Sequence, residues 1–201
     1  MVIRVFTTPV PVFYVAIRNV LSLLFYYTCC MVTPINYPKG FSPESRTWIY
    51  QASRSLSTTE QTEIQETLDQ FTANWQSHGE AVKGAAMVLP EGFIMLVADH
   101  TVCEVSGCST DSSVRTIREL DARYQLDLFN RQVLAFLVND AVVRIPLQEL
   151  PCQVEKGAVQ PDTLYFNNMV QTLSDLESGW LIPAEKSWLA KKFRTVANPV
   201  A

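Results

Sequence analysis

Residues 97–113 read VADHTVCEVSGCSTDSS, and the rest of the chain is organised around this stretch. An apolar strand runs out into a polar loop, and the loop leads into a helix. Unpaired backbone N–H groups at a helix N-terminus attract anions and lower the pKa of a thiol. The side chains near this position are Asp99, His100, Cys108, Ser109 and Asp111. We expect Ser109 or Asp111 to cap the helix, and Gly107 to supply a backbone angle that other residues resist.

On the N-terminal side, the pattern predicts a strand over 47–51 and a helix that begins with a capping box at Ser57-Thr58-Thr59-Glu60. The apolar stripe of this helix contains Ile64, Leu68, Phe71 and Trp75. His78 and Gly79 are predicted to end it. Strands over 81–89 and 92–98 follow, joined by a turn at 90–92.

On the C-terminal side, Val114, Ile117, Leu120 and Tyr124 form the apolar stripe of a second helix. Asn139-Asp140 then separates two strands, 132–138 and 141–145, as the turn of a hairpin. Beyond Pro146 we expect a short helical turn to about Leu150, a strand over 163–166 and a helix near 170–176.

This element order predicts an α+β fold: one domain with an antiparallel sheet and two main helices. The core would be a ferredoxin-like βαββαβ arrangement, with an extra strand and a C-terminal helical extension. A different sheet order built from the same elements is the alternative. The domain is expected over 44–195, preceded by a Pro-rich linker at 34–43.

Residues 1–33 form an apolar N-terminal extension. Residues 12–32 are nearly long enough for a membrane helix, but Arg18 and Asn19 interrupt them. Three interpretations stay open: a mis-assigned start with Met31 as the first residue, a membrane anchor, and a signal sequence. The location is accordingly expected to be cytoplasmic, or membrane-anchored through residues 12–32.

Charge argues against nucleic acid as a partner. The net charge is −4, and residues 41–201 hold all 20 acidic residues against 13 Lys and Arg. Phosphate contacts need clustered Lys and Arg, which this part of the chain offers only near residues 191–194. The five cysteines lack a disulfide framework and indicate a reducing compartment.

Four motifs carry a family resemblance: RTWIYQ at 46–51, WQSHG at 75–79, GCSTDSSV at 107–114 and PDTLYFNN at 161–168. In this order they resemble an uncharacterised family of Bacteroidota proteins whose members are often labelled "ABC transporter ATPase". The resemblance covers about residues 41–193. It implies no activity, because the family has none that we can name.

The label conflicts with the chemistry of nucleotide binding. A phosphate-binding loop needs Gly-x-x-x-x-Gly-Lys-[Ser/Thr], because bare amides wrap the phosphates. The Lys186-Ser187 pair has Trp180 and Glu185 at the two glycine positions. The Leu-Ser-Gly-Gly-Gln signature of transporter ATPases is also missing. We expect no ATPase activity and no cofactor.

The remaining candidate residues fall into three groups. A zinc site of His100, Cys103 and Cys108 with Asp99 lacks metal-ligand spacing, so no metal is expected. Catalytic candidates are Cys108, His78 and Asp99, although His78 also suits a helix end. Binding candidates are Arg46, Trp48, Ser109, Asp111, Asn167 and Asn168.

Two functions from different classes stay open. The first is a cofactor-free binding or adaptor domain, in which the loop and the Trp-rich tail form a groove for a protein or a small molecule. The second is a thiol-dependent enzyme with Cys108 as nucleophile. The sequence favours the first, because no complete catalytic signature is present.

Overall fold

The computed structural model describes residues 35–101 and 106–197, all within one compact unit, and the side chains up to Phe193. The apolar extension with Met31, and Cys103 of the considered zinc set, lie outside the described residues. Among the residues described, no helix has the length and apolar character to span a bilayer. The possible anchor at 12–32 lies outside that search.

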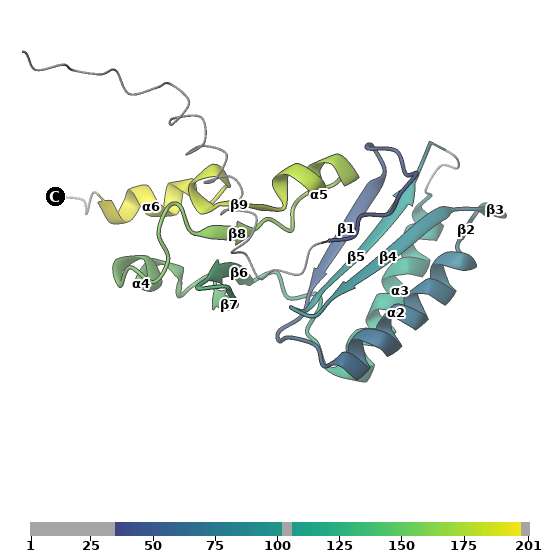
Figure 1. Ribbon diagram of the computed structural model, residues 1–201, viewed down its shortest axis with the longest axis horizontal. Helices are drawn as coiled ribbons and strands as arrows, with labels where there is room; N and C mark the ends of the chain where they lie inside the picture. Colours follow the sequence, from purple (N-terminus) through teal and green to yellow (C-terminus); the bar gives the residue numbers. More distant parts are fainter. Residues whose placement is uncertain (1–34, 102–105, 198–201) are drawn as a thin grey trace, which may run out of the picture. The chain divides into compact units, whose positions relative to one another are not determined.

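The first sheet has the strand order β1-β5-β4 and is antiparallel. Its strands are β1 (Arg46–Gln51), β4 (Lys83–Leu89) and β5 (Phe93–Asp99). Helices α2 (Thr58–Ala73) and α3 (Gly107–Tyr124) lie side by side against one face of it (Figure 1). Each residue of the central strand β5 is buried, because aromatic side chains cover part of the other face too.

The core between this sheet and its helices follows the predicted stripes. Ile64 and Leu68 of α2, and Ile117 and Leu120 of α3, are at most 2% exposed. They pack with Tyr50, Ile94 and Leu96 of the sheet. Burying a side chain of this size contributes about 1.5 to 3 kcal/mol, so the two stripes account for much of the stability.

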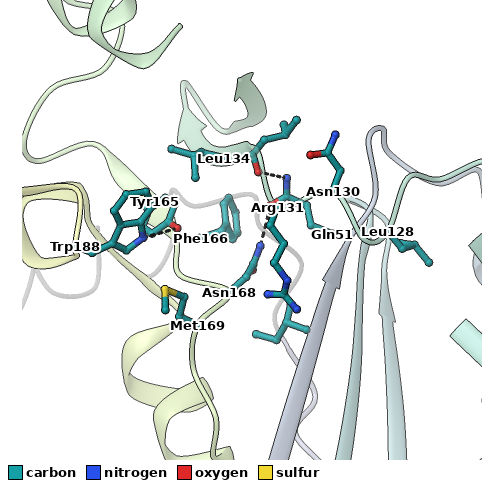
Figure 2. A pocket seen from close by; sticks show the side chains of 12 residues that line it. Gln51, Leu128, Asn130, Arg131, Leu134, Tyr165, Phe166, Asn168, Met169 and Trp188 are labelled. Atoms are coloured by element: carbon teal, nitrogen blue, oxygen red, sulfur yellow. Dashed lines mark hydrogen bonds between the residues drawn. The ribbon is translucent and has the colours of Figure 1, made fainter. Parts of the chain in front are cut away.

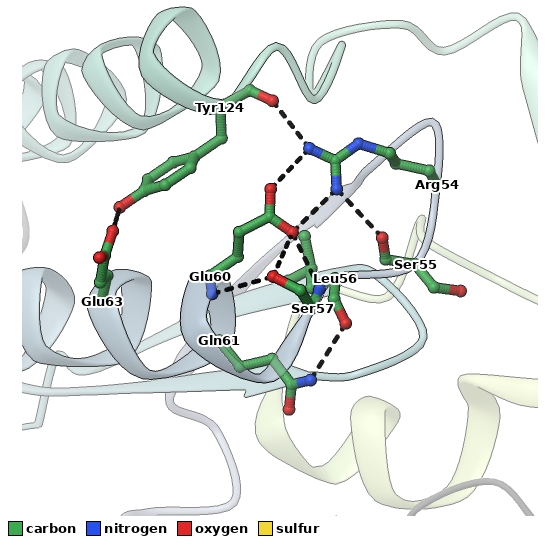
Figure 3. A network of polar contacts seen from close by, with 8 residues as sticks. All are labelled: Arg54, Ser55, Leu56, Ser57, Glu60, Gln61, Glu63 and Tyr124. Carbon is green, nitrogen blue, oxygen red and sulfur yellow. Dashed lines mark hydrogen bonds and ion pairs between the residues drawn. The ribbon is translucent and has the colours of Figure 1, made fainter.

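A polar network, which we call the Arg54 network, joins the start of α2 to the end of α3 (Figure 3). Ser57 and Glu60 form the predicted capping box. Arg54 donates to both carboxylate oxygens of Glu60, at 2.7 and 2.9 Å, and to the carbonyl of Tyr124 at 3.0 Å. The Tyr124 hydroxyl donates to Glu63 at 2.5 Å. The Arg54 hydrogen bonds and the Ser57 N–H lower the pKa of Glu60 from 4.5 to about 2.

The predicted end of the first helix is wrong. Helix α2 stops at Ala73, where the Asn74 N–H donates to the carbonyls of Phe71 and Thr72. His78 and Gly79 are instead the turn of a small hairpin, β2 (Gln76–Ser77) with β3 (Glu80–Ala81). Both have positive φ, 53° and 86°, as a two-residue type I′ turn requires. The same glycine signal marks both a helix end and this turn, which explains the error.

A second antiparallel sheet has the strand order β7-β6-β8-β9. It contains β6 (Val133–Val138), β7 (Ala141–Pro146), β8 (Leu164–Phe166) and β9 (Leu181–Pro183). Asn139 and Asp140, with φ of 49° and 59°, make the predicted hairpin turn. The accompanying helices are α4 (Leu150–Glu155), α5 (Leu173–Gly179), the 3-10 turn η1 (Ala184–Lys186) and α6 (Ala190–Ala197).

The α+β class with antiparallel sheets and two main helices is confirmed, but the full ferredoxin-like arrangement is not. Strands β1, β5 and β4 have the order of its first three strands. The fourth, β6, pairs with β7 and β8 in the second sheet. At its first residues, the outer edge of β1 pairs with another segment of the chain. Arg46 forms a β-bridge with Thr172, and the Thr47 N–H donates to the Gln171 carbonyl at 2.8 Å.

Contacts between the two sheets include one cation and one aromatic cluster. Arg144 on β7 donates to the carbonyls of Ala52 and Glu91 in the loops of the first sheet. In the cluster, Phe93 packs on Phe166 and Trp180 with ring centroids 4.7 and 5.0 Å apart. These contacts hold β8 and the end of α5 beside the first sheet, where the cavities described next are formed.

Candidate functional site

The carboxylate of Asp99, a catalytic candidate, is engaged in structural contacts at the end of β5. It accepts from Lys83 at 3.0 Å, from the Thr101 hydroxyl at 2.6 Å and from the Ser42 N–H at 3.3 Å. Lys83 also donates to the Gly40 carbonyl. The Thr101 hydrogen bond is the main cause that lowers the pKa of Asp99 from 3.8 to about 2. These contacts fix the linker residues Gly40 and Ser42 against the sheet.

The predicted helix caps are wrong, because α3 begins earlier than expected. Ser106 is the N-cap, and its hydroxyl accepts from the Ser109 N–H at 3.3 Å. Ser109 is buried, and its carbonyl accepts from the Trp75 indole at 2.9 Å. Asp111 is exposed within the helix. Gly107 lacks a positive φ, and a Cβ there would meet nothing within 4 Å. The special backbone angle predicted for Gly107 is therefore wrong.

Cys108 is exposed in the first turn of α3. The turn residue His78 is also exposed, and its neighbour Ser77 donates to the Ser106 hydroxyl at 3.0 Å. Between described residues, no hydrogen bond joins the Cys108 thiol to His78, Asp99 or Asp111. The structure therefore brings the hairpin turn to the helix start without assembling a nucleophile and base.

A cavity of about 180 Å³, which we call the Arg131 cavity, lies between β1, β8 and the loop before β6 (Figure 2). Its apolar lining includes Ile49, Leu128, Val133, Leu134, Tyr165, Phe166, Met169 and Trp188. Its polar lining is Gln51, Asn130, Arg131 and Asn168. Met169 and Trp188 are 65% and 44% exposed, so two large apolar side chains border the cavity in contact with water.

A second cavity of about 520 Å³ adjoins the first along the edge of β1. The two share Ile49, Arg131, Asn168 and Met169. Of the predicted site residues, Arg46, Trp48, His100 and Asn168 line it. The Arg46 guanidinium lies 5.1 Å from the Trp48 ring centroid. Trp48 therefore has a cation on its face and forms part of the wall.

A chain of amide hydrogen bonds forms the floor of the Arg131 cavity. The Trp180 indole donates to Asn168 at 3.1 Å, Asn168 donates to Gln51 at 2.8 Å, and Gln51 donates to the Val133 carbonyl at 3.1 Å. Asn167 lies outside both cavities, and its side chain donates to the Gly179 carbonyl at 3.2 Å. Asn168 thus has a structural role in the wall, while Asn167 holds the end of α5.

Among the described residues, Arg131 is the only charged side chain that lines the first cavity. Within residues 35–101 and 106–197, its guanidinium forms no hydrogen bond or ion pair. Burial raises the pKa of Tyr50, and the positive charge of Arg131 opposes this shift. Arg131 and Met169 were not predicted as site residues from the sequence, because both lie in loops without a periodic pattern. The cavity offers an unpaired cation beside an apolar wall.

No group of three His, Cys, Asp or Glu residues within the described ranges is placed to hold a metal ion. Cys103 of the considered zinc set was outside that search. The Arg131 cavity presents an apolar wall, amides that have hydrogen-bond partners and one guanidinium without a partner among the described residues.

Comparisons with known proteins found no match that bears on this site. No family model matches the chain, and neither a curated protein nor a solved structure matches it. The resemblance to the Bacteroidota family with the ATPase label thus stays a prediction.

Proposed function

We propose that this domain is a cofactor-free binding or adaptor module whose binding site is the Arg131 cavity. The observation that carries the proposal is the grouping of exposed Met169 and Trp188 with the unpaired Arg131. Trp, Met and Arg are enriched at protein interfaces, and Trp and Arg dominate binding hot spots. Exposed apolar side chains that are grouped at one cavity, rather than scattered singly, mark interaction sites.

The chemistry of the cavity favours a ligand with an apolar body and a negative charge. A guanidinium binds a carboxylate with two parallel hydrogen bonds, and this pairing is strongest where water is excluded. The body of the chain is acidic overall, and Arg131 adds a positive charge at the cavity.

Two small probes test the proposal: 2-naphthoate and its neutral analogue 2-naphthamide. We expect both to shift backbone amide signals around Leu128, Tyr165 and Met169 in ¹⁵N NMR spectra, with tighter binding of the acid. Arg131→Gln should weaken naphthoate binding at least fivefold and leave naphthamide binding unchanged. Trp188→Ala should weaken both. Shifts confined to other parts of the chain would overturn the proposal.

Val143→Ala is the matched control. Val143 is the other exposed large apolar residue, at 38%, and lies on β7 outside the Arg131 cavity. Its truncation should change neither probe's affinity. Equal losses in Val143→Ala and Trp188→Ala would show that the probes bind exposed apolar surface in general.

An ATPase function is not proposed, whatever label the resemblance carries. Lys186 lies in the short turn η1, with Glu185 exposed beside it. Isothermal titration with Mg-ATP is expected to give no saturable heat, and Lys186→Ala should not alter that result. Micromolar binding that disappears in Lys186→Ala would contradict this expectation.

A further inference from the structure

The edge of β1 is covered along only part of its length. Residues of an antiparallel strand direct their backbone N–H and C=O groups alternately to the two sides. The Ala52 N–H donates to Gly92 on the β5 side. On the other side, the Ser45 carbonyl accepts from Leu173 and the Thr47 N–H donates to Gln171. Odd-numbered residues of β1 therefore direct their backbone groups to the outer edge.

This alternation puts the backbone groups of Ile49 and Gln51 on the same outer edge as Thr47. In the part of the chain that the structure describes, neither residue forms a backbone hydrogen bond on that side. The covering segment leaves β1 before Ile49, and Ile49 lines both cavities. Ile49 and Gln51 are 6% and 8% exposed, and both line the Arg131 cavity. A length of strand edge without backbone partners among the described residues is therefore reached through this cavity.

We infer that the edge of β1 at Ile49 and Gln51 binds an extended peptide segment of a partner protein by strand addition. The segment carries an apolar side chain, which enters the Arg131 cavity, and a neighbouring carboxylate, which pairs with Arg131. This inference rests on the proposed function and names the class of its partner.

Three independent features favour a peptide over a small organic acid. Main-chain groups of a peptide pair with a strand edge, which a small acid cannot do over two residues. A volume of about 180 Å³ suits one side chain better than a larger apolar ligand. The charge is complementary, because Arg131 and Arg46 line the adjoining second cavity, where Glu44 is the only acidic side chain.

The test uses the acetylated and amidated pentapeptide Thr-Val-Leu-Asp-Thr on the full chain. At saturation, we expect amide hydrogen exchange at Ile49 and Gln51 to slow at least tenfold, because peptide main-chain groups replace water there. Methylating the peptide's backbone nitrogens at alternate positions should weaken binding at least tenfold. Replacing its Asp with Asn should weaken binding at least fivefold, and this loss should vanish in Arg131→Gln.

Arg115→Gln is the control, because Arg115 is exposed on α3 and lines neither cavity. In this variant the Asp-to-Asn difference should persist. The probe 2-naphthoate separates the two proposals, since it should bind without slowing exchange at Ile49. If naphthoate binds and the pentapeptide leaves exchange at Ile49 and Gln51 unchanged, the strand-addition inference falls and the proposed function stands. If neither binds, both fall.

Discussion

Two arginines in loops, Arg54 after β1 and Arg131 before β6, differ in what surrounds their guanidinium groups. Arg54 donates to Glu60, to the carbonyl of Ser55 and to that of Tyr124. Arg131 forms no such contact with any described residue, yet it borders an apolar cavity. The first arrangement is explained by the geometry that it fixes between α2 and α3. The second has no hydrogen-bond or ion-pair partner among the described residues, which is why we propose a role in binding for it.

The largest expected effect concerns the backbone beside Arg54. Gly92 has a φ of +92°, and a Cβ there would lie 2.2 Å from the Arg54 carbonyl oxygen. Because positive φ strains an L-residue and the neighbour is backbone, Gly92→Ala should lower the free energy of unfolding by about 2 to 4 kcal/mol. Urea unfolding measures this loss. Gly157→Ala, also at positive φ but with nothing within 4 Å, should lose less. Equal losses would mean that crowding is unimportant.

The amide floor of the cavity gives the second prediction. Asn168→Ala leaves the Trp180 indole and the side-chain amide oxygen of Gln51 without their partners, so stability should fall by about 1 to 3 kcal/mol. Thermal and urea denaturation measure the change. Asn130→Ala, an exposed residue of the same cavity, should lose less than half as much. A silent Asn168→Ala would show that water replaces the amide without cost.

The third prediction compares Ser106, whose side chain is hydrogen-bonded, with two exposed side chains at the start of α3. Ser106→Ala removes the cap and the hydrogen bond to Ser77, and should cost about 0.5 to 2 kcal/mol. Asp111→Ala and Cys108→Ser change exposed side chains and should stay within about 0.5 kcal/mol of the parent chain. The midpoints of urea unfolding measure the stability of the three variants. A cap-sized loss in Asp111→Ala would place the helix start where the sequence predicted it.

The smallest expected effect is a pH dependence that separates the two arginines. Folding lowers the pKa of Glu60 to about 2, so its contribution is complete above pH 4.5 and is lost as the pH falls toward 2. Because the Arg54 side chain is 45% exposed, the pair contributes only about 0.5 to 1 kcal/mol. Glu60→Gln should remove this part of the acid-induced loss.

Arg131→Gln is the counterpart of that variant. It breaks no internal ion pair, so its stability should match the parent chain within about 0.5 kcal/mol from pH 3 to pH 7. Urea unfolding at several pH values checks both variants. A marked destabilisation of Arg131→Gln at pH 7 would give Arg131 a structural role and remove the contrast with Arg54.

Local patterns predicted the first sheet and its two helices well. The capping box at Ser57, the stripe of Ile64 and Leu68, and the turn at Asn139-Asp140 each depend on residues close in sequence. The short strands β8 and β9 have three residues each, too few for a periodic pattern to define a sheet. The partner of β6 depends on packing between distant segments, so the predicted fourth strand of the first sheet went to the second sheet.

The candidate site was harder to predict for the same reason. Gln51 and Asn168, which meet in the cavity wall, are 117 residues apart in the chain. Arg131 follows no motif, and only its place in the cavity lining, which depends on the three-dimensional fold, distinguishes it. The sequence predicted a site in the polar loop at 97–113, because this loop concentrates side chains that can act as acids, bases or nucleophiles. In the structure, Asp99 forms an ion pair with Lys83. Of the candidates that the structure describes in that loop, His100 alone lines either of the two cavities described above.

The hydrogen bond from the Thr47 N–H to the Gln171 carbonyl has a consequence for synthesis on the ribosome. Strands β1, β4 and β5 with both main helices are complete once residue 124 has emerged, whereas Gln171 emerges 47 residues later. At ordinary translation rates this interval is roughly 2 to 10 s. During that time the nascent chain exposes the whole outer edge of β1 and the ring of Phe93 to solvent, so the half-made domain is more open to aggregation than the finished one.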